Sequence, residues 1–380
     1  MSAKRAFSAV LIGGLVLTLL TISRAQVDTR RIEEVLKKDV LTQQDFAVID
    51  AFVNEAIGRL VRTIDFTEVA KTRAYIVSHQ GAQAQYAQRF SEALQREIAA
   101  GFDYAANEIS DAERRFRVFT NLLILVNELK DPRLVDLAIR MLPHANAAVR
   151  YWAVRTATSP EIWSKLSQDQ ASAAPLARKI IDASGQIVAA SRPEVLYLMA
   201  EFAGRYDTVP AEDLLGRIAD VRIGQYATWA VEYELADTAI LRLLCDKITA
   251  GGTANPQLAK QFAQLYSYAI QRYIKGIRAD NLKGLSRNYL ASVLIDTEEQ
   301  CLGRLLGTPQ ANVRRAIEAA DLDALQAEHN RLLGGPNQTG TLPSKLRFTY
   351  GSPGDNRSVP LAMPEPAQER AVAETQTAQP

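Results

Sequence analysis

Apolar residues recur at every third or fourth position along most of this chain, which is the spacing of one buried face of an α-helix. A clear early example is the series Phe46, Ile49, Val53, Ala56, Ile57 and Leu60. The N-terminal quarter contains several such series with no strand pattern between them, and comparable series continue to residue 333. The body of the chain is therefore predicted to be almost entirely helical.

Helix-starting signals divide this pattern into separate elements. Side chains placed to accept hydrogen bonds from the free N–H groups of a first helical turn are Thr42, Asp65, Asp111 and Asn146. Prolines that fit the first helical position are Pro132, Pro160, Pro193 and Pro256. Toward the C-terminus we predict helices over residues 256–277, 281–307 and 310–333, and two glycines and a proline at 334–336 end the last of them.

Residues 131–157 read as two helices joined by a tight turn at 143–144, so the two helices must lie antiparallel. In the second helix, Val149 and Ala153 face the first helix, and the small alanine allows close approach. Arg150 lies at the rim, where it can bond to neighbouring turns. A pair of this kind cannot bury both of its faces alone, and it therefore implies stacked neighbours.

This stretch resembles a HEAT repeat, whose second helix begins with Val-Arg and carries an alanine three residues after the arginine. Arg150 and Ala153 match that pattern, whereas Asn146 stands where HEAT repeats commonly have aspartate. Val-Arg recurs at 221–222 and 313–314, at unequal separations, so the stack is expected to be irregular.

The resemblance implies an all-α fold, an irregular α-solenoid of the HEAT or armadillo type, built from antiparallel helix pairs. We expect an N-terminal helical region over residues 26–105 and a HEAT-like repeat region over residues 106–335. Residues 336–380 are rich in Pro, Gly, Ser, Thr, Gln and Ala, and we expect a disordered tail. One segment of it, KLRFTY at 345–350, alternates apolar and polar residues and could add as a strand to a partner or pack on the last helix.

The first residues have the pattern of a secretory signal. Lys4 and Arg5 precede an apolar run, and small residues at Ser23 and Ala25 fit a cleavage site after residue 25. We expect residues 1–25 to be a signal peptide and the protein to be exported, to the periplasm or the exterior. The alternative is that residues 6–22 form an uncleaved membrane anchor, although the run is short for a bilayer span.

Composition narrows the classes of partner. Cleavage after residue 25 would remove three basic residues and lower the formal net charge from +1 to −2. Basic and acidic residues are interspersed throughout, and no nucleic-acid partner is expected, because nucleic-acid-binding proteins gather basic charge on one face.

Cys245 and Cys301 are predicted to be half-buried thiols on the apolar faces of separate helices. In an oxidising compartment, a disulfide between them is the alternative.

The chain offers little recognisable chemistry. No phosphate-binding glycine loop, nucleophile elbow or zinc-binding helix motif is present. The histidines are isolated from one another and are assigned to a helix end (His79), a turn (His144) and a solvent-facing position beside Glu328 (His329). We expect no catalytic residue, no cofactor and no metal site.

Glu232 and Glu234 carry the alternative of a glycan-active enzyme, because they stand beside Trp229 and Tyr233, and an aromatic wall with acids can bind a sugar. Two residues apart on a helix, however, the acids point away from each other. The two aromatics are therefore assigned to core packing.

Tyr151 and Trp152 are the candidate partner-binding residues. Because they are adjacent, one of them must leave the apolar stripe of its helix, and an exposed aromatic can anchor a partner. The alternative is that both pack, one on each neighbouring repeat.

The leading functional hypothesis is an exported, non-catalytic protein-binding or scaffold module, since stacked helices present extended surfaces to protein partners. The alternatives are an envelope glycan-active enzyme on a helical toroid and, if the signal is uncleaved, a membrane-anchored assembly factor.

Overall fold

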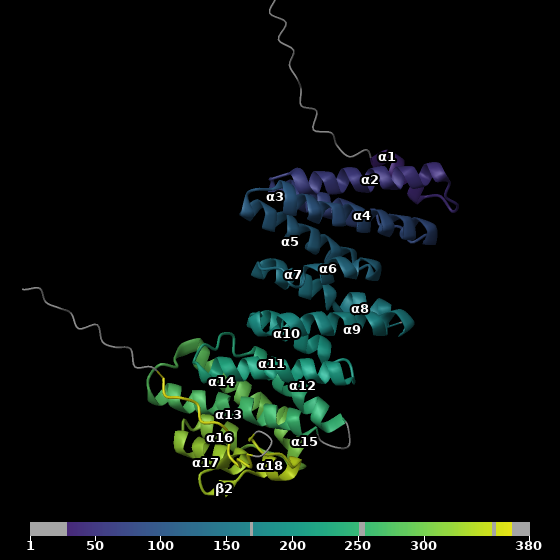
Figure 1. Ribbon diagram of the computed structural model, residues 1–380. Helices are drawn as coiled ribbons and strands as arrows, with labels where there is room; N and C mark the ends of the chain where they lie inside the picture. The colour runs from purple at the N-terminus through teal and green to yellow at the C-terminus, as the bar shows by residue number, and fades with distance from the viewer. Residues whose placement is uncertain (1–28, 168–169, 251–254, 352–354, 367–380) are drawn as a thin grey trace, which may run out of the picture.

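The computed structural model describes residues 29–167, 170–250, 255–351 and 355–366 (Figure 1). Nearly every element in these ranges is a helix, and their one sheet is a two-stranded hairpin, so the predicted all-α fold is confirmed. The expected signal peptide and the alternative membrane anchor lie outside the described residues. Within the described ranges, no helix has both the length and the apolar character needed to cross a membrane.

The N-terminal helices are α1 (Thr29–Leu36), α2 (Gln43–Arg62), α3 (Phe66–Ser78), α4 (Ala84–Glu108) and α5 (Ala112–Leu129). Three of them, α2, α3 and α5, begin at the predicted caps Thr42, Asp65 and Asp111. The Thr42 side chain accepts from the backbone N–H of Asp45, and the Asp45 carboxylate accepts from the N–H of Thr42 at 2.9 Å, which forms a reciprocal capping box. The Asp65 and Asp111 side chains accept from backbone N–H groups in the first turns of α3 and α5.

The stretch that resembles a HEAT repeat folds as a helical pair. Its elements are the short 3-10 helix η1 (Pro132–Leu134), α6 (Val135–Met141) and α7 (Ala147–Ala157). Asn146 caps α7, and Val149 and Ala153 are completely buried. Arg150 donates to the backbone oxygen of His144, in the turn before α7, at 3.0 Å and to that of Ala190, in the turn before α10, at 3.4 Å. It therefore binds neighbouring turns, as predicted.

The middle of the chain continues the stack. Its elements are α8 (Pro160–Leu166), α9 (Gln170–Ile187), the short η2 (Val188–Ala190), α10 (Pro193–Ala203), α11 (Val209–Ala227), α12 (Ala236–Ala250) and α13 (Pro256–Arg278). Helices two positions apart in the chain pack on each other, as α2 does on α4, α5 on α7, α10 on α12 and α11 on α13. This is the packing of a solenoid, in which each layer contacts the next one.

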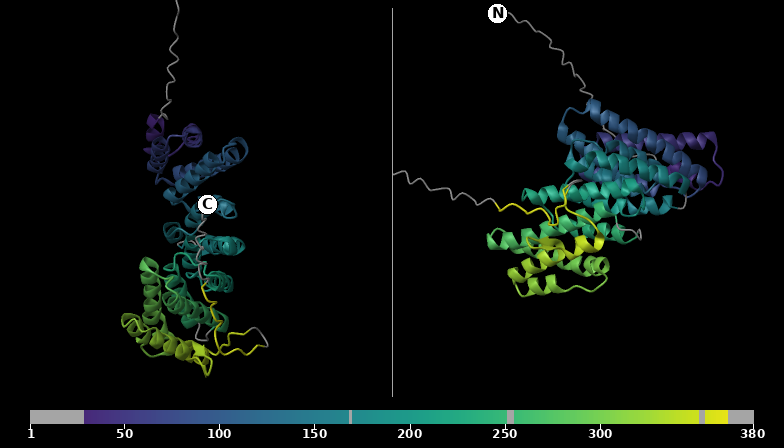
Figure 2. Two further views of the ribbon diagram at one scale, coloured as in Figure 1. Left: turned by 90° about the vertical axis from the view of Figure 1, so that its left-hand side faces the viewer. Right: turned by 60° about the horizontal axis from the view of Figure 1, so that its bottom comes forward.

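Figures 1 and 2 show the helix layers following one another along one long axis, with α1 at one end and α16 to α18 at the other. One continuous hydrophobic core runs through the stack from Ile32 to Met363. The boundary expected at residues 105–106 falls inside α4, which packs on both α2 and α5. The core is therefore continuous across that position.

The C-terminal helices differ from the predicted bounds. Residues 281–307 contain α14 (Gly284–Thr297), a π-helical segment η3 (Glu298–Leu302) and α15 (Gly303–Leu306). The single helix predicted over residues 310–333 is wrong, because two helices are present, α16 (Asn312–Glu318) and α17 (Leu322–Leu333). Ala320 takes a left-handed conformation with φ of 53°, and Asp321 caps a new helix, so the chain turns between them.

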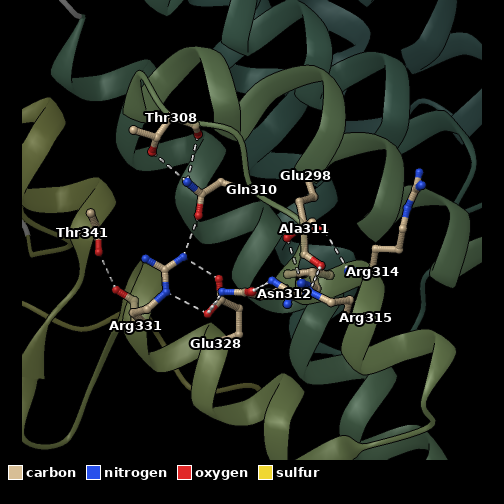
Figure 3. A network of polar contacts seen from close by, with 11 residues as sticks. Glu298, Thr308, Gln310, Ala311, Asn312, Arg314, Arg315, Glu328, Arg331 and Thr341 are labelled. Atoms are coloured by element: carbon tan, nitrogen blue, oxygen red, sulfur yellow. Dashed lines mark hydrogen bonds and ion pairs between the residues drawn. The ribbon is translucent and has the colours of Figure 1, made fainter.

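A polar network fixes α16 and α17 against each other (Figure 3). The buried Glu298 carboxylate accepts from the backbone N–H groups of Val313 and Arg314, each at 2.8 Å, and so caps α16. Glu328 on α17 is bound by Arg331 at 2.5 and 2.7 Å and by Asn312 at 3.2 Å. The network thus joins η3, α16 and α17.

The disordered tail expected from residue 336 is corrected for residues 336–351 and 355–366, which have defined positions, while residues 367–380 lie outside the described part. This region begins with the hairpin of β1 (Gly334–Gly335) and β2 (Gln338–Thr339), followed by α18 (Thr341–Leu346). Its anchors Leu342, Tyr350 and Met363 are buried, which offsets the entropy of ordering. The KLRFTY segment packs on the last helix, because the Tyr350 hydroxyl donates to the Leu333 backbone oxygen at 2.9 Å.

Candidate functional site

Residues 355–366, which we call the strap, run along α13 without regular secondary structure. In Figure 1 the strap is drawn in yellow and passes over α13. The α13 residues that bind it are Gln264, Gln271 and Lys275. At 3.6 residues per turn, separations of seven and eleven residues bring these three side chains to one face of the helix. They form a row that follows the helix axis.

The two glutamines bind the strap through its main chain. The Gln264 amide accepts from the Leu361 N–H at 2.8 Å and donates to the Leu361 oxygen at 3.3 Å. The Gln271 amide accepts from the Met363 N–H at 2.7 Å and donates to the Leu361 oxygen at 3.0 Å. Each amide carries a donor and an acceptor and therefore satisfies a main chain as a neighbouring strand would.

Two further side chains complete the contact. The Lys275 ammonium donates to the Met363 oxygen at 2.6 Å and pairs with the Glu365 carboxylate at 2.5 Å. The Trp229 indole N–H donates to the Pro364 oxygen at 3.0 Å. Every one of these bonds except the Glu365 ion pair is made to the main chain. These bonds would form with any extended polypeptide, because they involve its main chain.

An open cavity of about 470 Å³ lies beside the strap. Its lining includes Gln271, Lys275, Arg278, Asn330 and the strap residue Glu365. One flank of the groove along α13 is therefore unfilled, and it carries basic side chains.

A buried polar relay orients Gln271. Its amide donates to the Ser267 hydroxyl at 2.9 Å, and Ser267 contacts His329 Nε2 at 2.8 Å. His329 Nδ1 contacts the Asn330 side-chain oxygen at 3.1 Å. Because Asn330 offers an acceptor, we assign the proton to Nδ1, which leaves Nε2 to accept from Ser267. Ser267 is completely buried in the middle of α13, so the relay holds an amide rather than activating a nucleophile.

His329 does not face solvent, so its predicted position is wrong. It is 5% exposed, because α17 packs on α13. Burial lowers the pKa of His329 below its ordinary value, which favours the neutral ring that the relay needs. The other two histidines lie as predicted, His79 at the end of α3 and His144 in the turn before α7. In the described ranges, no cluster of three or more potential metal ligands occurs.

The loop between α11 and α12 positions Trp229. Glu232 and Glu234 were expected on a helix, but the neighbouring Trp229 and Tyr233 take left-handed conformations with φ of 60° and 53°, and the chain forms a loop. The Arg272 guanidinium lies 5.5 Å from the centroid of the Trp229 ring and donates to the Trp229 oxygen at 3.4 Å. The loop thus places the indole N–H over the strap.

A buried ion pair anchors this loop. Arg222 on α11 binds both carboxylate oxygens of Asp237, at 2.6 and 2.8 Å, and both residues are completely buried. The Tyr226 hydroxyl donates to the same carboxylate at 2.8 Å, and Arg222 also donates to the Glu232 backbone oxygen at 3.1 Å. Arg222 belongs to the second Val-Arg pair of the sequence, so this arginine binds across to α12 and the loop.

The acids of the glycan-enzyme alternative are not brought together. Glu232 is exposed, whereas Glu234 is buried and pairs with Arg272 at 3.0 Å. Tyr233 is 57% exposed, so its predicted core packing is wrong, because the loop conformation turns it outward. Trp229 is partly buried against the core. With Glu234 neutralised by an arginine, the aromatic neighbourhood lacks an acid pair.

Tyr151 and Trp152 are both half-buried and pack against the core. Their rings meet edge to face with centroids 5.6 Å apart. Arg155 joins them, since its guanidinium lies 5.6 Å from the Trp152 centroid and donates to the Tyr151 hydroxyl at 3.1 Å. Each ring therefore keeps part of its surface open on α7.

Cys245 on α12 and Cys301 in η3 lie side by side. The Cys245 thiol approaches the Cys301 backbone oxygen at 3.8 Å, and both thiols are free and buried. They are on separate helical segments, as predicted, but almost completely rather than half buried. Their mutual contact lowers the pKa of Cys245 and raises that of Cys301.

Comparison with known proteins adds no assignment. No protein-family model matches this chain, and no curated protein matches it. Among solved structures, a crystal structure of an engineered protein is similar over 86% of this chain and 95% of its own, with 13% sequence identity and a TM-score of 0.21. A TM-score this low does not show a shared fold.

Gln264, Gln271 and Lys275 were not predicted as site residues from the sequence. The signal that was present is polar: buried glutamines stand among the apolar residues of α13, where a helix facing only other helices would carry leucine or alanine. A buried amide needs hydrogen-bond partners, which the strap supplies.

Proposed function

We propose that this chain is a non-catalytic protein-binding scaffold, which binds an extended polypeptide in the groove along α13. The observation that carries the proposal is the row of side-chain bonds from Gln264, Gln271, Lys275 and Trp229 to the main chain of the strap. Main-chain bonds supply affinity to any extended segment, as in strand addition. In the structure, the strap occupies the groove that a partner segment would bind.

We also propose that the protein is exported. The signal-like residues 1–25 support a periplasmic or extracellular location, where such a scaffold would meet other exported proteins. Tyr151 and Trp152 on α7 are proposed as a second contact surface, supported by their half-exposed rings. Replacing either by alanine should weaken binding of a partner that uses this surface by about 1 kcal/mol or more.

The strap competes with any partner, because a tethered segment has an effective concentration in the millimolar range. The test therefore uses the full chain with the strap weakened by Met363→Ala and Glu365→Gln. Binding of a fluorescent peptide of residues 357–366 is measured by anisotropy. We expect the strap-weakened chain to bind the peptide at least about tenfold more tightly than the unaltered chain.

Adding Gln271→Ala to the strap-weakened chain should reduce that binding. Gln257→Ala is the matched control, because Gln257 is an exposed glutamine on the same helix and should change nothing. Circular dichroism establishes that each variant keeps its helices. Equal binding by the strap-weakened and Gln271→Ala chains would overturn the groove as the site.

A second measurement needs no variant. In the unaltered chain, a large excess of the peptide should displace the strap and raise hydrogen exchange at the amides of Leu361 and Met363. Unchanged exchange at saturating peptide would show that the strap is a permanent part of the fold.

A further inference from the structure

The strap does not present all of its side chains to the groove. Pro360 is buried and Met363 is 1% exposed, whereas Leu361 is 43% exposed and Ala362 and Pro364 are also exposed. Leu361 nevertheless donates and accepts main-chain bonds with Gln264. The groove therefore binds Leu361 through its main chain and buries the side chains of Pro360 and Met363, as expected for an extended segment whose side chains alternate in direction.

The prolines fall where the groove requires no N–H. The strap N–H groups that donate to α13 belong to Leu361 and Met363. Pro360, Pro364 and Pro366 stand at alternating positions, so the absence of their N–H groups costs no bond to the groove. Proline also restricts the free segment toward extended conformations, which lowers the entropy lost on binding.

Glu365 of the strap pairs with Lys275, which also binds the strap main chain. Lys275 binds the Met363 oxygen and the Glu365 carboxylate with one ammonium group. The Lys275 side chain is 23% exposed and the Glu365 side chain is 78% exposed, so water reaches the carboxylate and the ion pair adds a preference for an acid rather than a large part of the affinity. A segment with a neutral or basic residue at the position of Glu365 would leave that charge unpaired.

We infer that the partner is a polypeptide that presents an extended Pro-x-x-Met-x-Glu pattern, with a buried proline, a large apolar residue three positions later and an acid two positions after that. This inference names the partner of the groove and rests on the proposed function. The pattern is the one in Pro360, Met363 and Glu365, which occupy the groove within the same chain.

The test compares peptides on the strap-weakened full chain described above. Peptides of residues 357–366 carry Met363→Ala or Glu365→Gln, and the matched control carries Ala362→Ser at an exposed position. We expect Met363→Ala to weaken binding about tenfold or more, because Met363 is buried, and Glu365→Gln to weaken it about three- to fivefold, because its ion pair is largely solvated, while the control stays within about twofold.

A charge exchange sharpens the result. The strap-weakened chain with Lys275→Glu should prefer a Glu365→Lys peptide over the unaltered one, which reverses the order found with lysine in place. Equal affinities across the peptide series, with no reversal, would overturn the recognition pattern while leaving a groove that binds main chain alone. Absence of binding by every peptide would instead overturn the proposed function.

Discussion

Arg222 is among the largest side chains buried completely in this protein, and its charge is matched by the Asp237 carboxylate. Removing a buried charge from water is costly, so the pair is stable only while both partners are present. It ties α11 to α12 and carries the loop that places Trp229 over the strap. A single side chain at this position thus connects the core to the candidate site.

Asp237→Asn should destabilise the protein by about 3 to 5 kcal/mol, because it leaves the Arg222 charge buried without a counter-charge. Urea unfolding of the full chain measures the change. Asp103→Asn is the matched control, since the Asp103–Arg140 pair is more than half exposed and should contribute less than about 1 kcal/mol. Similar losses for the two substitutions would contradict this account of the buried pair.

His329 predicts a pH dependence of stability. Its folded-state pKa is lowered by burial below the ordinary 6.5, so below that pH the unfolded chain binds a proton that the folded chain does not. Stability should therefore fall as pH drops from 7.5 to 5.5. His144 contributes in the same direction, because its pKa is also lowered, chiefly by burial.

The measurement is the melting temperature at the two pH values. The variant His329→Gln, which keeps a polar side chain beside Ser267, should lose less stability on acidification than the unaltered chain. The same pH-dependent loss in both proteins would remove His329 as a cause.

At the scale of elements, the caps decide where each helix begins. Asn146 opens α7 by accepting from the N–H groups of Ala148 at 2.9 Å and Val149 at 3.2 Å. Aspartate, the residue common at this position in HEAT repeats, has the same acceptor geometry. The cap therefore forms with an amide in place of a carboxylate.

Asn146→Ala should cost about 1 kcal/mol of stability, because two N–H groups lose their acceptor. Asn146→Asp keeps the acceptor and places a negative charge at a helix N-terminus, so it should be neutral or stabilising. Chemical unfolding of both variants gives the comparison. If aspartate cost as much as alanine, the contribution of Asn146 would lie outside capping.

At the scale of the whole molecule, each layer of the stack contacts its neighbours, and remote layers communicate only through the layers between them. Local stability should therefore differ along the chain. The groove lies near one end, where α13 packs on α11, α12 and α17. Its integrity depends on those helices rather than on the N-terminal ones.

Leu94→Ala in α4 removes a side chain that is 1% exposed and should cost about 2 to 5 kcal/mol locally. Hydrogen exchange should become faster in α2 and α4 and remain unchanged in α13. Leu265→Ala, in the middle of α13, should produce the opposite distribution. Faster exchange throughout the chain after Leu94→Ala would indicate one cooperative unit.

Sequence alone determined the features that depend on residues a few positions apart. The helical periodicity, the caps at Thr42, Asp65, Asp111 and Asn146, and the antiparallel pair at residues 131–157 are all local, and the structure contains each of them. These local signals did not predict two places where a left-handed residue ends a helix. Ala320 and Asp321 break a continuous apolar pattern, and Glu232 and Glu234, expected on a helix, lie in a loop.

Only the tertiary structure decided the site, because its contacts join residues that are remote in sequence. Leu361 lies 97 positions from Gln264, and the two thiols lie 56 positions apart. A buried glutamine indicates that a partner exists but carries no information about which main chain it binds. The region from residue 336 was expected to be disordered on composition, since few of its residues are apolar, yet Tyr350 and the strap residue Met363 are buried against helices that must first pack together.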